Sequence, residues 1–335
     1  GSDLPTALKA PVKKEPAAIV RHEGREQPFS RGLLASSLRA AGVEPDRAYR
    51  LVTELEALLR SEGVRLVSSG DLARRVDDLL EEQEGVETAR RYRLARRIQR
   101  LPRPVVLYVG GASGTGKSTL ALELAPLLHI QRVSSTDTIR QVMRMVFTPA
   151  MLPALHASSF EVATGPEGIE PSGSPRDPEF AERLIASFEE QATRVAVGVR
   201  AVVERAITEN LNLLVEGVHV HPALMPFSDL EGSAYQVPLI LGTFDSEAHR
   251  SRFLSRARTS GRRAERYLEA FDSIRVVHDH LLHLAETHRV PLVDTSEGDP
   301  PIMASLRLVT GILERSWPEL DAVDGDLGPS APTLL

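Results

Sequence analysis

The stretch VVLYVGGASGTGKSTL, residues 105–120, decides the fold of this chain. Its first five residues form a continuous apolar run, which is typical of a strand buried on both faces of a parallel sheet. The motif G-x-x-x-x-G-K-[ST] follows at 111–118, and a helical pattern of leucines comes next. Because glycines let the backbone N–H groups of such a turn face phosphates, the sequence predicts a P-loop that binds a nucleoside triphosphate.

Individual positions of the P-loop have separate expected roles. Lys117 is expected to bridge the β and γ phosphates, and the hydroxyl of Ser118 is expected to hold Mg²⁺. Lys117 is also the only lysine after Lys14, so arginine fills every later cationic position but this one. A compact ammonium on phosphate is a role that arginine does not fill. The residues expected to bind ATP are Gly111, Ala112, Ser113, Gly114, Thr115, Gly116, Lys117, Ser118 and Thr119.

Further apolar runs follow, separated by stretches of helical length. They predict strands at 131–135, 211–215, 236–241 and 290–293. A long helix is expected before the strand at 211–215, with Asp177 as N-cap, Pro178 as first helical residue and an end near Glu209. This alternation predicts an α/β fold, a P-loop kinase domain with a doubly wound parallel sheet, over residues 102–317, followed by a flexible tail at 318–335.

The residues before this sheet predict a small, mostly α-helical domain at 17–101, preceded by a flexible leader at 1–16. Residues 18–21 and 27–29 flank a turn and predict a short hairpin. Leucine periodicity predicts three helices, with Ser69 as N-cap of the third, and a fourth, arginine-rich helix is expected to end before Pro102 and Pro104. Their expected ranges are 30–41, 46–61, 69–83 and 86–100.

Composition excludes several classes of protein. The 335 residues carry a net charge of -6, so no global basic field exists to attract nucleic acid or an anionic membrane. Cysteine is absent, which excludes disulfides, thiolate catalysis and zinc–thiolate sites and fits a reducing compartment. No apolar run reaches the length of a membrane span, and the start lacks a signal-peptide pattern. We therefore expect a cytoplasmic protein without nucleic-acid or membrane partners; the oligomeric state stays open.

Polar residues follow the predicted strands at their carboxyl ends, where ligands bind in such sheets. Asp137 could orient or deprotonate an acceptor hydroxyl, and Arg140 could hold an acceptor phosphate or carboxylate. The alternative is an N-cap aspartate beside a surface arginine. Glu216 ends the third strand and is the second candidate Mg²⁺ residue, directly or through water, with a purely structural role as its alternative. Whether Asp137 or Glu216 is the base stays open.

An arginine-rich segment at 249–266 is expected to form a lid over the phosphates. Arginines there, including Arg252 and Arg256, would neutralise charge on the γ-phosphoryl oxygens and exclude water. Charge runs also form solvated helix faces, so which of these arginines touch phosphate stays open. The histidines do not predict a zinc site, because their i,i+2 spacings share no helix face and no cysteine completes a set. They are at 219, 221, 278, 280 and 283.

Several stretches together resemble the 2-phosphoglycerate kinase family. They are GGASGTGKST at 110–119, STDTIRQVMR at 135–144, LPALHASSF at 152–160, LLVEGVHVHP at 213–222, HRSRFLSRA at 249–257 and RYLEAFDSIR at 266–275. The resemblance implies an ATP- and Mg²⁺-dependent transfer of the γ-phosphoryl group to the 3-hydroxyl of a small phosphorylated acceptor, 2-phosphoglycerate. It also implies that Arg252 and Arg256 belong to the lid and that the acceptor is bordered by Asp137, Arg140, His156, Ser158, Ser159 and Glu216.

The first domain resembles the ATP-cone, a regulatory nucleotide-binding module, at 19–42 and 89–97. The usual Lys-Arg-Asp-Gly turn of that family stands here as Arg-His-Glu-Gly at 21–24. A second nucleotide at this domain therefore stays open beside a packing role. For the whole chain, two alternatives remain: a P-loop kinase for another small phosphorylated or carboxylated metabolite or a nucleoside, and a non-enzymatic ATP sensor.

Overall fold

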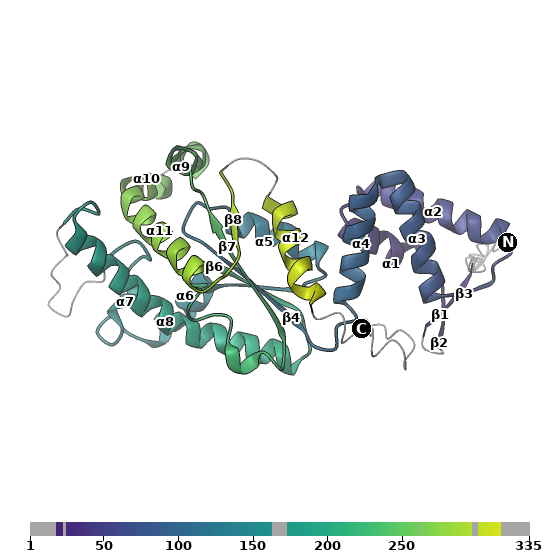
Figure 1. Cartoon of the computed structure of the whole chain (residues 1–335), viewed down its shortest axis with the longest axis horizontal. Coiled ribbons are helices and arrows are strands. Elements are labelled where there is room, and N and C mark those ends of the chain that lie inside the picture. The colour runs from purple at the N-terminus through teal and green to yellow at the C-terminus, as the bar shows by residue number, and fades with distance from the viewer. Residues whose placement is uncertain (1–17, 23–24, 163–172, 261, 297–300, 316–335) are drawn as a thin grey trace, which may run out of the picture. The chain divides into compact units, whose positions relative to one another are not determined.

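The computed structural model describes residues 18–22, 25–162, 173–260, 262–296 and 301–315 (Figure 1). The leader expected at 1–16 and the tail expected at 318–335 lie outside these residues. The chain divides into two compact units, and the first ends at Arg96 while the second begins at Arg97. Each unit has its own hydrophobic core.

The first unit combines a three-stranded sheet with helices. Strand β1 (Ile19–His22) pairs antiparallel with β2 (Arg25–Pro28), which confirms the hairpin, and parallel with β3 (Leu66–Ser68). The four expected helices are present as α1 (Arg31–Ala40), α2 (Pro45–Ser61), α3 (Ser69–Glu84) and α4 (Val86–Ile98). Their leucines fill the core of this unit, in which Leu51, Leu59 and Leu80 are fully buried.

One expected cap in this unit is wrong. Ser68, not Ser69, is the N-cap of α3, because the Ser68 side chain accepts a hydrogen bond from the backbone N–H of Asp71 at 3.0 Å. Ser68 is also the last residue of β3, a strand that the sequence did not predict. The chain therefore passes from strand to helix without an intervening loop.

The second unit is built on a five-stranded parallel sheet in the order β5-β6-β4-β7-β8. All five strands predicted from apolar runs are present, with ends shifted by two residues at most. They are β4 (Val105–Gly110), β5 (Arg132–Ser135), β6 (Leu213–Gly217), β7 (Tyr235–Gly242) and β8 (Leu292–Asp294). The doubly wound parallel sheet is thereby confirmed.

Helices cover both faces of this sheet (Figure 1). Helices α5 (Lys117–Leu127) and α12 (Pro301–Glu314) lie on one side. On the other side, α8 (Pro178–Thr208) and α11 (Phe271–Thr287) pack over Val106 and Tyr108 of β4. The expected start of α8 is confirmed, since the Asp177 carboxylate accepts from the N–H of Glu179 at 3.2 Å. The remaining helices are α6 (Thr136–Val146), α7 (Pro153–His156), the short Ser228–Leu230, α9 (Ser246–Ser260) and α10 (Arg262–Glu269).

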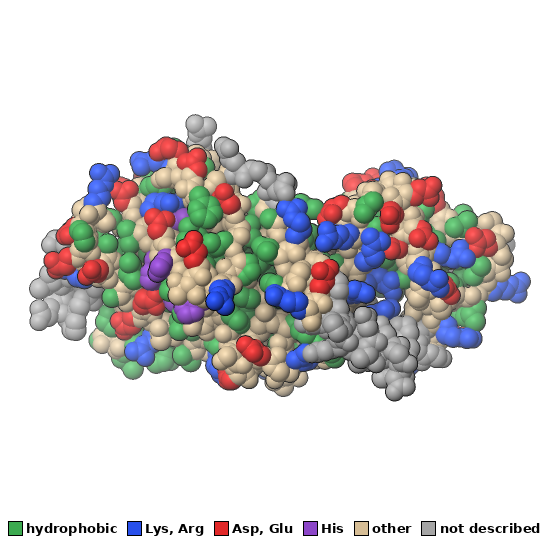
Figure 2. Space-filling view, viewed as in Figure 1, with side chains coloured by type: hydrophobic (Ala, Val, Ile, Leu, Met, Phe, Trp, Pro, Cys, Tyr) green, Lys and Arg blue, Asp and Glu red, His purple; other side chains and the backbone are tan. Residues whose placement is uncertain are grey.

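The surface of the second unit carries charges of both signs. Figure 2 shows cationic and acidic side chains interspersed over the face in view. Among the described helices, none combines the length and the apolar character that crossing a bilayer requires.

Candidate active site

The P-loop connects β4 to α5 in the strand–turn–helix order that the motif predicts. Lys117 is the first residue of α5, and its ammonium donates to the Ala112 carbonyl at 3.3 Å. Gly114 has a φ of +86°, and a Cβ there would lie 2.5 Å from the Phe253 ring and 2.9 Å from His249 Nε2. Only glycine therefore fits at this point of the turn.

The two expected Mg²⁺ residues lie side by side. Strand β6 pairs with β4 so that Glu216 stands opposite Val109, the residue two positions before the P-loop begins. The Ser118 hydroxyl donates to the Glu216 carboxylate at 2.9 Å, and Glu216 is buried. A hydroxyl and a carboxylate offer the oxygen ligands that Mg²⁺ prefers, so these residues fit the ion.

His249 of α9 contacts the backbone of the P-loop. It is fully buried, its Nε2 donates to the Ser113 carbonyl at 2.8 Å, and its Nδ1 lies 3.4 Å from a guanidinium nitrogen of Arg275. Burial lowers the pKa of His249 to about 4. The ring of Phe253, one turn further along α9, lies 5.4 Å from the His249 ring. The first turns of α9 thus pack against the P-loop and support its conformation. The arginine pattern of this segment did not indicate that role.

Arg252 lies beside the P-loop at the wall of a cavity of about 300 Å³. Its guanidinium donates to the Thr295 hydroxyl at 2.9 Å and to the Thr295 carbonyl, and it reaches the Gly114 carbonyl at 3.4 Å. Thr119 and Pro301 line the same cavity, whose size suits a nucleoside moiety. Arg256 also belongs to α9, but its side chain lies outside the described part of the chain.

Asp137 and Arg140 lie in α6, directly after β5. Ser135 is the N-cap of this helix, since its side chain accepts from the N–H of Asp137 at 3.3 Å, so the alternative of an N-cap aspartate is wrong. The Asp137 carboxylate is 60% exposed, whereas Arg140 is 17% exposed and is therefore no surface arginine. Burial lowers the pKa of Arg140, although the Asp137 carboxylate, 3.6 Å away, opposes this effect.

The segment around α7 carries the other residues that the resemblance implied. His156 Nε2 donates to the Phe147 carbonyl at 2.8 Å, which turns the ring toward the end of α6. Arg266 of α10 donates to the Ser158 hydroxyl at 2.8 Å and pairs with Glu161 at 2.5 Å. Ser159 is partly exposed at the same turn. Arg266 thus links the lid segment to the expected acceptor side, a link that sequence spacing did not reveal.

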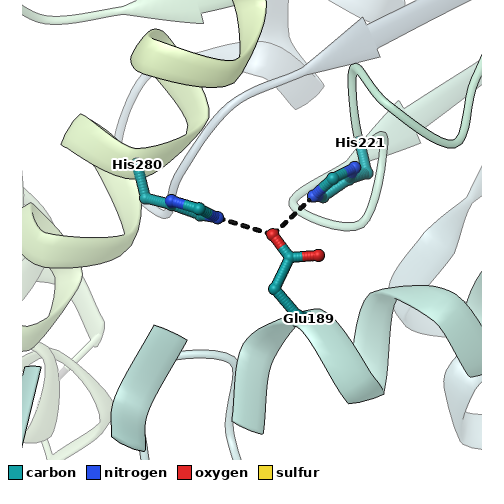
Figure 3. Close-up of side chains that lie close together, drawn as sticks. All are labelled: Glu189, His221 and His280. Carbon is teal, nitrogen blue, oxygen red and sulfur yellow. Dashed lines mark hydrogen bonds and ion pairs between the residues drawn. The ribbon is translucent and has the colours of Figure 1, made fainter. Parts of the chain in front are cut away.

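Two histidines from distant segments meet at Glu189 of α8 (Figure 3). The Glu189 carboxylate accepts from His221 Nε2 at 2.8 Å and from His280 Nε2 at 2.5 Å. Burial opposes ionisation of Glu189, but these two hydrogen bonds outweigh it and hold the pKa of Glu189 below its usual value.

The spacing argument did not foresee this group of three, which has the composition of a metal site. However, His221 Nδ1 accepts from the N–H of Ala223 at 3.2 Å, so the proton of the neutral ring sits on Nε2. A histidine that binds metal through Nε2 instead donates from Nδ1. The hydrogen bonds therefore favour a proton-linked cluster over a metal centre.

Known proteins match both units. The ATP cone domain family matches residues 17–101. The 2-phosphoglycerate kinase of Methanocaldococcus jannaschii is 36% identical over 295 residues, covering 87% of this chain and 91% of that protein. That of Methanopyrus kandleri is 38% identical over 90% of this chain and 89% of the relative.

The 2-phosphoglycerate kinase of Pyrococcus furiosus is 37% identical over 83% of this chain and 88% of the relative. Among solved structures, a putative kinase from Chloroflexus aurantiacus matches 64% of this chain and 98% of its own, at 16% identity and a TM-score of 0.32. The identity to three full-length relatives, over nearly the whole of each, shows that the chain belongs to the 2-phosphoglycerate kinase family.

Proposed function

We propose that this protein transfers the γ-phosphoryl group of ATP to the 3-hydroxyl of 2-phosphoglycerate, giving 2,3-bisphosphoglycerate and ADP in the cytoplasm. The observation that carries the proposal is the contact of Ser118 with Glu216 at the head of the P-loop, at 2.9 Å. The identity of the acceptor is inferred from the names of the relatives, which are 2-phosphoglycerate kinases. Mg²⁺, held through Ser118 and Glu216, would neutralise charge on the β and γ phosphates.

The two carboxylates of the site have different surroundings, which suggests different roles. Glu216 is buried and already accepts the Ser118 hydroxyl, so it serves the metal side. The Asp137 carboxylate is 60% exposed at the carboxyl end of β5, where an acceptor can reach it. We assign to Asp137 the role of general base, which accepts the proton of the acceptor's 3-hydroxyl.

The reaction then balances with this chain's own residues. The acceptor oxygen forms a bond to the γ-phosphorus, the bond from that phosphorus to the β–γ bridging oxygen breaks, and the hydroxyl proton passes to Asp137. Lys117 stabilises the charge that develops on the transferred group. The cavity beside Arg252 and Thr119 would take the nucleoside part of ATP.

A coupled ADP-release assay tests the proposal. 2-Phosphoglycerate should stimulate ADP release far more than 3-phosphoglycerate, glycerate or nucleosides. Lys117→Ala should abolish the stimulated release, and Asp137→Asn should cut it while ATP affinity stays the same. Stimulation by another acceptor alone would redirect the assignment to that metabolite, and Mg·ATP binding without any acceptor-stimulated release would identify a sensor.

The match to the ATP cone domain supports a second nucleotide site in the first unit. Calorimetric titration with Mg·ATP should then give two sites per chain in the wild type and one in the variant Lys117→Ala. A single site in the wild type that disappears in Lys117→Ala would leave the first unit with a packing role.

A further inference from the structure

A chain of buried polar side chains runs behind the expected acceptor site. His219 lies three residues after Glu216 and is fully buried, as are Thr136 and Gln191. His219 Nδ1 lies 3.1 Å from the Thr136 hydroxyl, and His219 Nε2 lies 2.7 Å from the Gln191 amide oxygen. Such buried polar groups are costly unless all of them are hydrogen-bonded.

The partners of Gln191 determine the direction of each hydrogen bond in this network of buried polar side chains. Its amide nitrogen donates to two backbone carbonyls, those of Ala154 and Ala157, the latter at 3.0 Å. The amide oxygen must therefore face His219, and because an amide oxygen only accepts, His219 Nε2 carries the proton. His219 Nδ1 is then left to accept from the Thr136 hydroxyl. Burial lowers the pKa of His219, which keeps the ring neutral as this arrangement requires.

Each end of this hydrogen-bonded network contacts or lies in an element that carries acceptor residues. At one end, Gln191 and Arg140 converge on the same α7 segment, since the Arg140 guanidinium donates to the Leu155 carbonyl at 3.2 Å and the Ala157 carbonyl at 2.8 Å. Ser158 and Ser159 follow immediately. At the other end, Thr136 directly precedes Asp137 in α6.

Thr136 is also locked against the strand that carries Glu216. The backbone of Gly217 has a φ of +147°, and a Cβ at Gly217 would overlap the Thr136 hydroxyl. The position of α6 is thereby set by β6, and the position of the α7 segment is set by the same β6 end through His219 and Gln191. The network therefore links the helix that carries Asp137 to the segment that precedes Ser158.

We propose that His219 and Gln191 are positioning residues for the phosphorylated acceptor, holding the α7 segment at a fixed distance from Asp137. This inference deepens the proposed function and rests on it for the identity of the acceptor. Loss of the network should weaken binding of the acceptor and leave the nucleotide site intact, because the held carbonyls belong to α7 and not to the P-loop.

The most selective variant is Gln191→Glu. An ionised glutamate keeps an oxygen for His219 Nε2 but has no donor for the carbonyls of Ala154 and Ala157, and a protonated one can donate to only one of them. At least one of the two hydrogen bonds is therefore lost. We expect the KM for 2-phosphoglycerate to rise about tenfold or more, with the KM for ATP changed less than about twofold. Glu190→Gln, one residue away on the exposed side of α8, is the matched control and should leave both constants unchanged.

A second pair of variants covers the case in which Gln191→Glu fails to fold. Thr136→Val removes the hydroxyl that donates to His219 and keeps the shape, whereas Thr136→Ser keeps the hydroxyl. The valine variant should raise the acceptor KM about threefold or more and the serine variant should restore it. Equal rises of both KM values in these variants, a fall of kcat alone, or equal behaviour of valine and serine would overturn the proposal.

Hydrogen exchange of the full chain gives a readout that needs no acceptor. Gln191→Glu should speed exchange of the backbone amides at 154–160, while exchange at 111–119 stays at the wild-type rate. Unchanged exchange at 154–160 would refute the positioning role. If the wild type shows no turnover with 2-phosphoglycerate, the proposed function fails while the exchange result still decides the inference.

Discussion

Replacing His249 with glutamine should remove a pH-dependent weakness of the larger unit. The folded His249 ring resists protonation, since burial lowers its pKa from 6.5 to about 4, and the nearby His278, Arg275 and Arg252 add to this effect. The unfolded chain accepts the proton readily, so the stability that His249 contributes is complete above about pH 6.5 and is lost as pH falls toward about 4. Glutamine can still donate to the Ser113 carbonyl but does not titrate.

The expected size follows from these two pKa values. Linkage gives a loss of unfolding free energy, through His249 alone, of about 2 kcal/mol at pH 5 and about 3 kcal/mol at pH 4 relative to pH 7. Other groups titrate in the same range, but they are present in both proteins and cancel in the comparison. The wild type should therefore lose about 2 kcal/mol more than His249→Gln between pH 7 and pH 5.

Calorimetry at a series of pH values measures this difference on the transition of the larger unit. His283→Gln makes the same change of residue type at an exposed position of α11, so it is the matched control and should follow the wild-type curve. Parallel curves for the wild type and His249→Gln from pH 7 to pH 5 would refute the reasoning about His249.

Four further substitutions test other positions of the protein. Gly114→Ala should destabilise the second unit by about 2–4 kcal/mol and abolish Mg·ATP binding at the P-loop in titration, because a Cβ there would lie 2.5 Å from the Phe253 ring. Gly63→Ala is the matched control, since Gly63 has a φ of +69° and no atom lies within 4 Å of where its Cβ would be. This variant should lose only the free energy of the backbone strain and keep Mg·ATP binding. Tyr108→Phe should lower the free energy of unfolding by about 1 kcal/mol in urea titration, since it removes one 2.8 Å hydrogen bond. Ser118→Ala should raise the Mg²⁺ concentration needed for half-maximal turnover, and an unchanged Mg²⁺ dependence would contradict its role.

The sheet was predictable because its signal is local. Val105 to Val109 and Leu213 to Val215 are wholly buried, and a run of apolar residues between helical stretches has few other uses. Strand β3 escaped prediction because three residues are too short to show a period, and its pairing with β1 comes from far along the sequence. The Ser69 cap was wrong for the same reason, since the unseen strand ends at Ser68.

The site was predictable only where a residue has a fixed place in a motif. Ser118 follows from the P-loop and Glu216 from a strand end, and parallel pairing brings them together. Gln191 and His219 lie 28 residues apart, and Gln191 sits on the buried face of a long helix, where its position reads as ordinary core. The role of a buried polar side chain can be recognised only when its hydrogen-bond partners are known, and the tertiary structure determines those partners.

The central place of β4 has a consequence for synthesis of the chain. Its two neighbours in the sheet are β6 and β7, so the strand that leads into the P-loop has no partner in the sheet until β6, which ends at Gly217, has been made. At roughly 5–20 residues per second, on the order of ten seconds pass between the addition of Gly110 and that of Gly217 at the ribosome's catalytic centre. During that interval a nascent apolar ribbon is exposed to chaperones, and the first unit has time to fold alone.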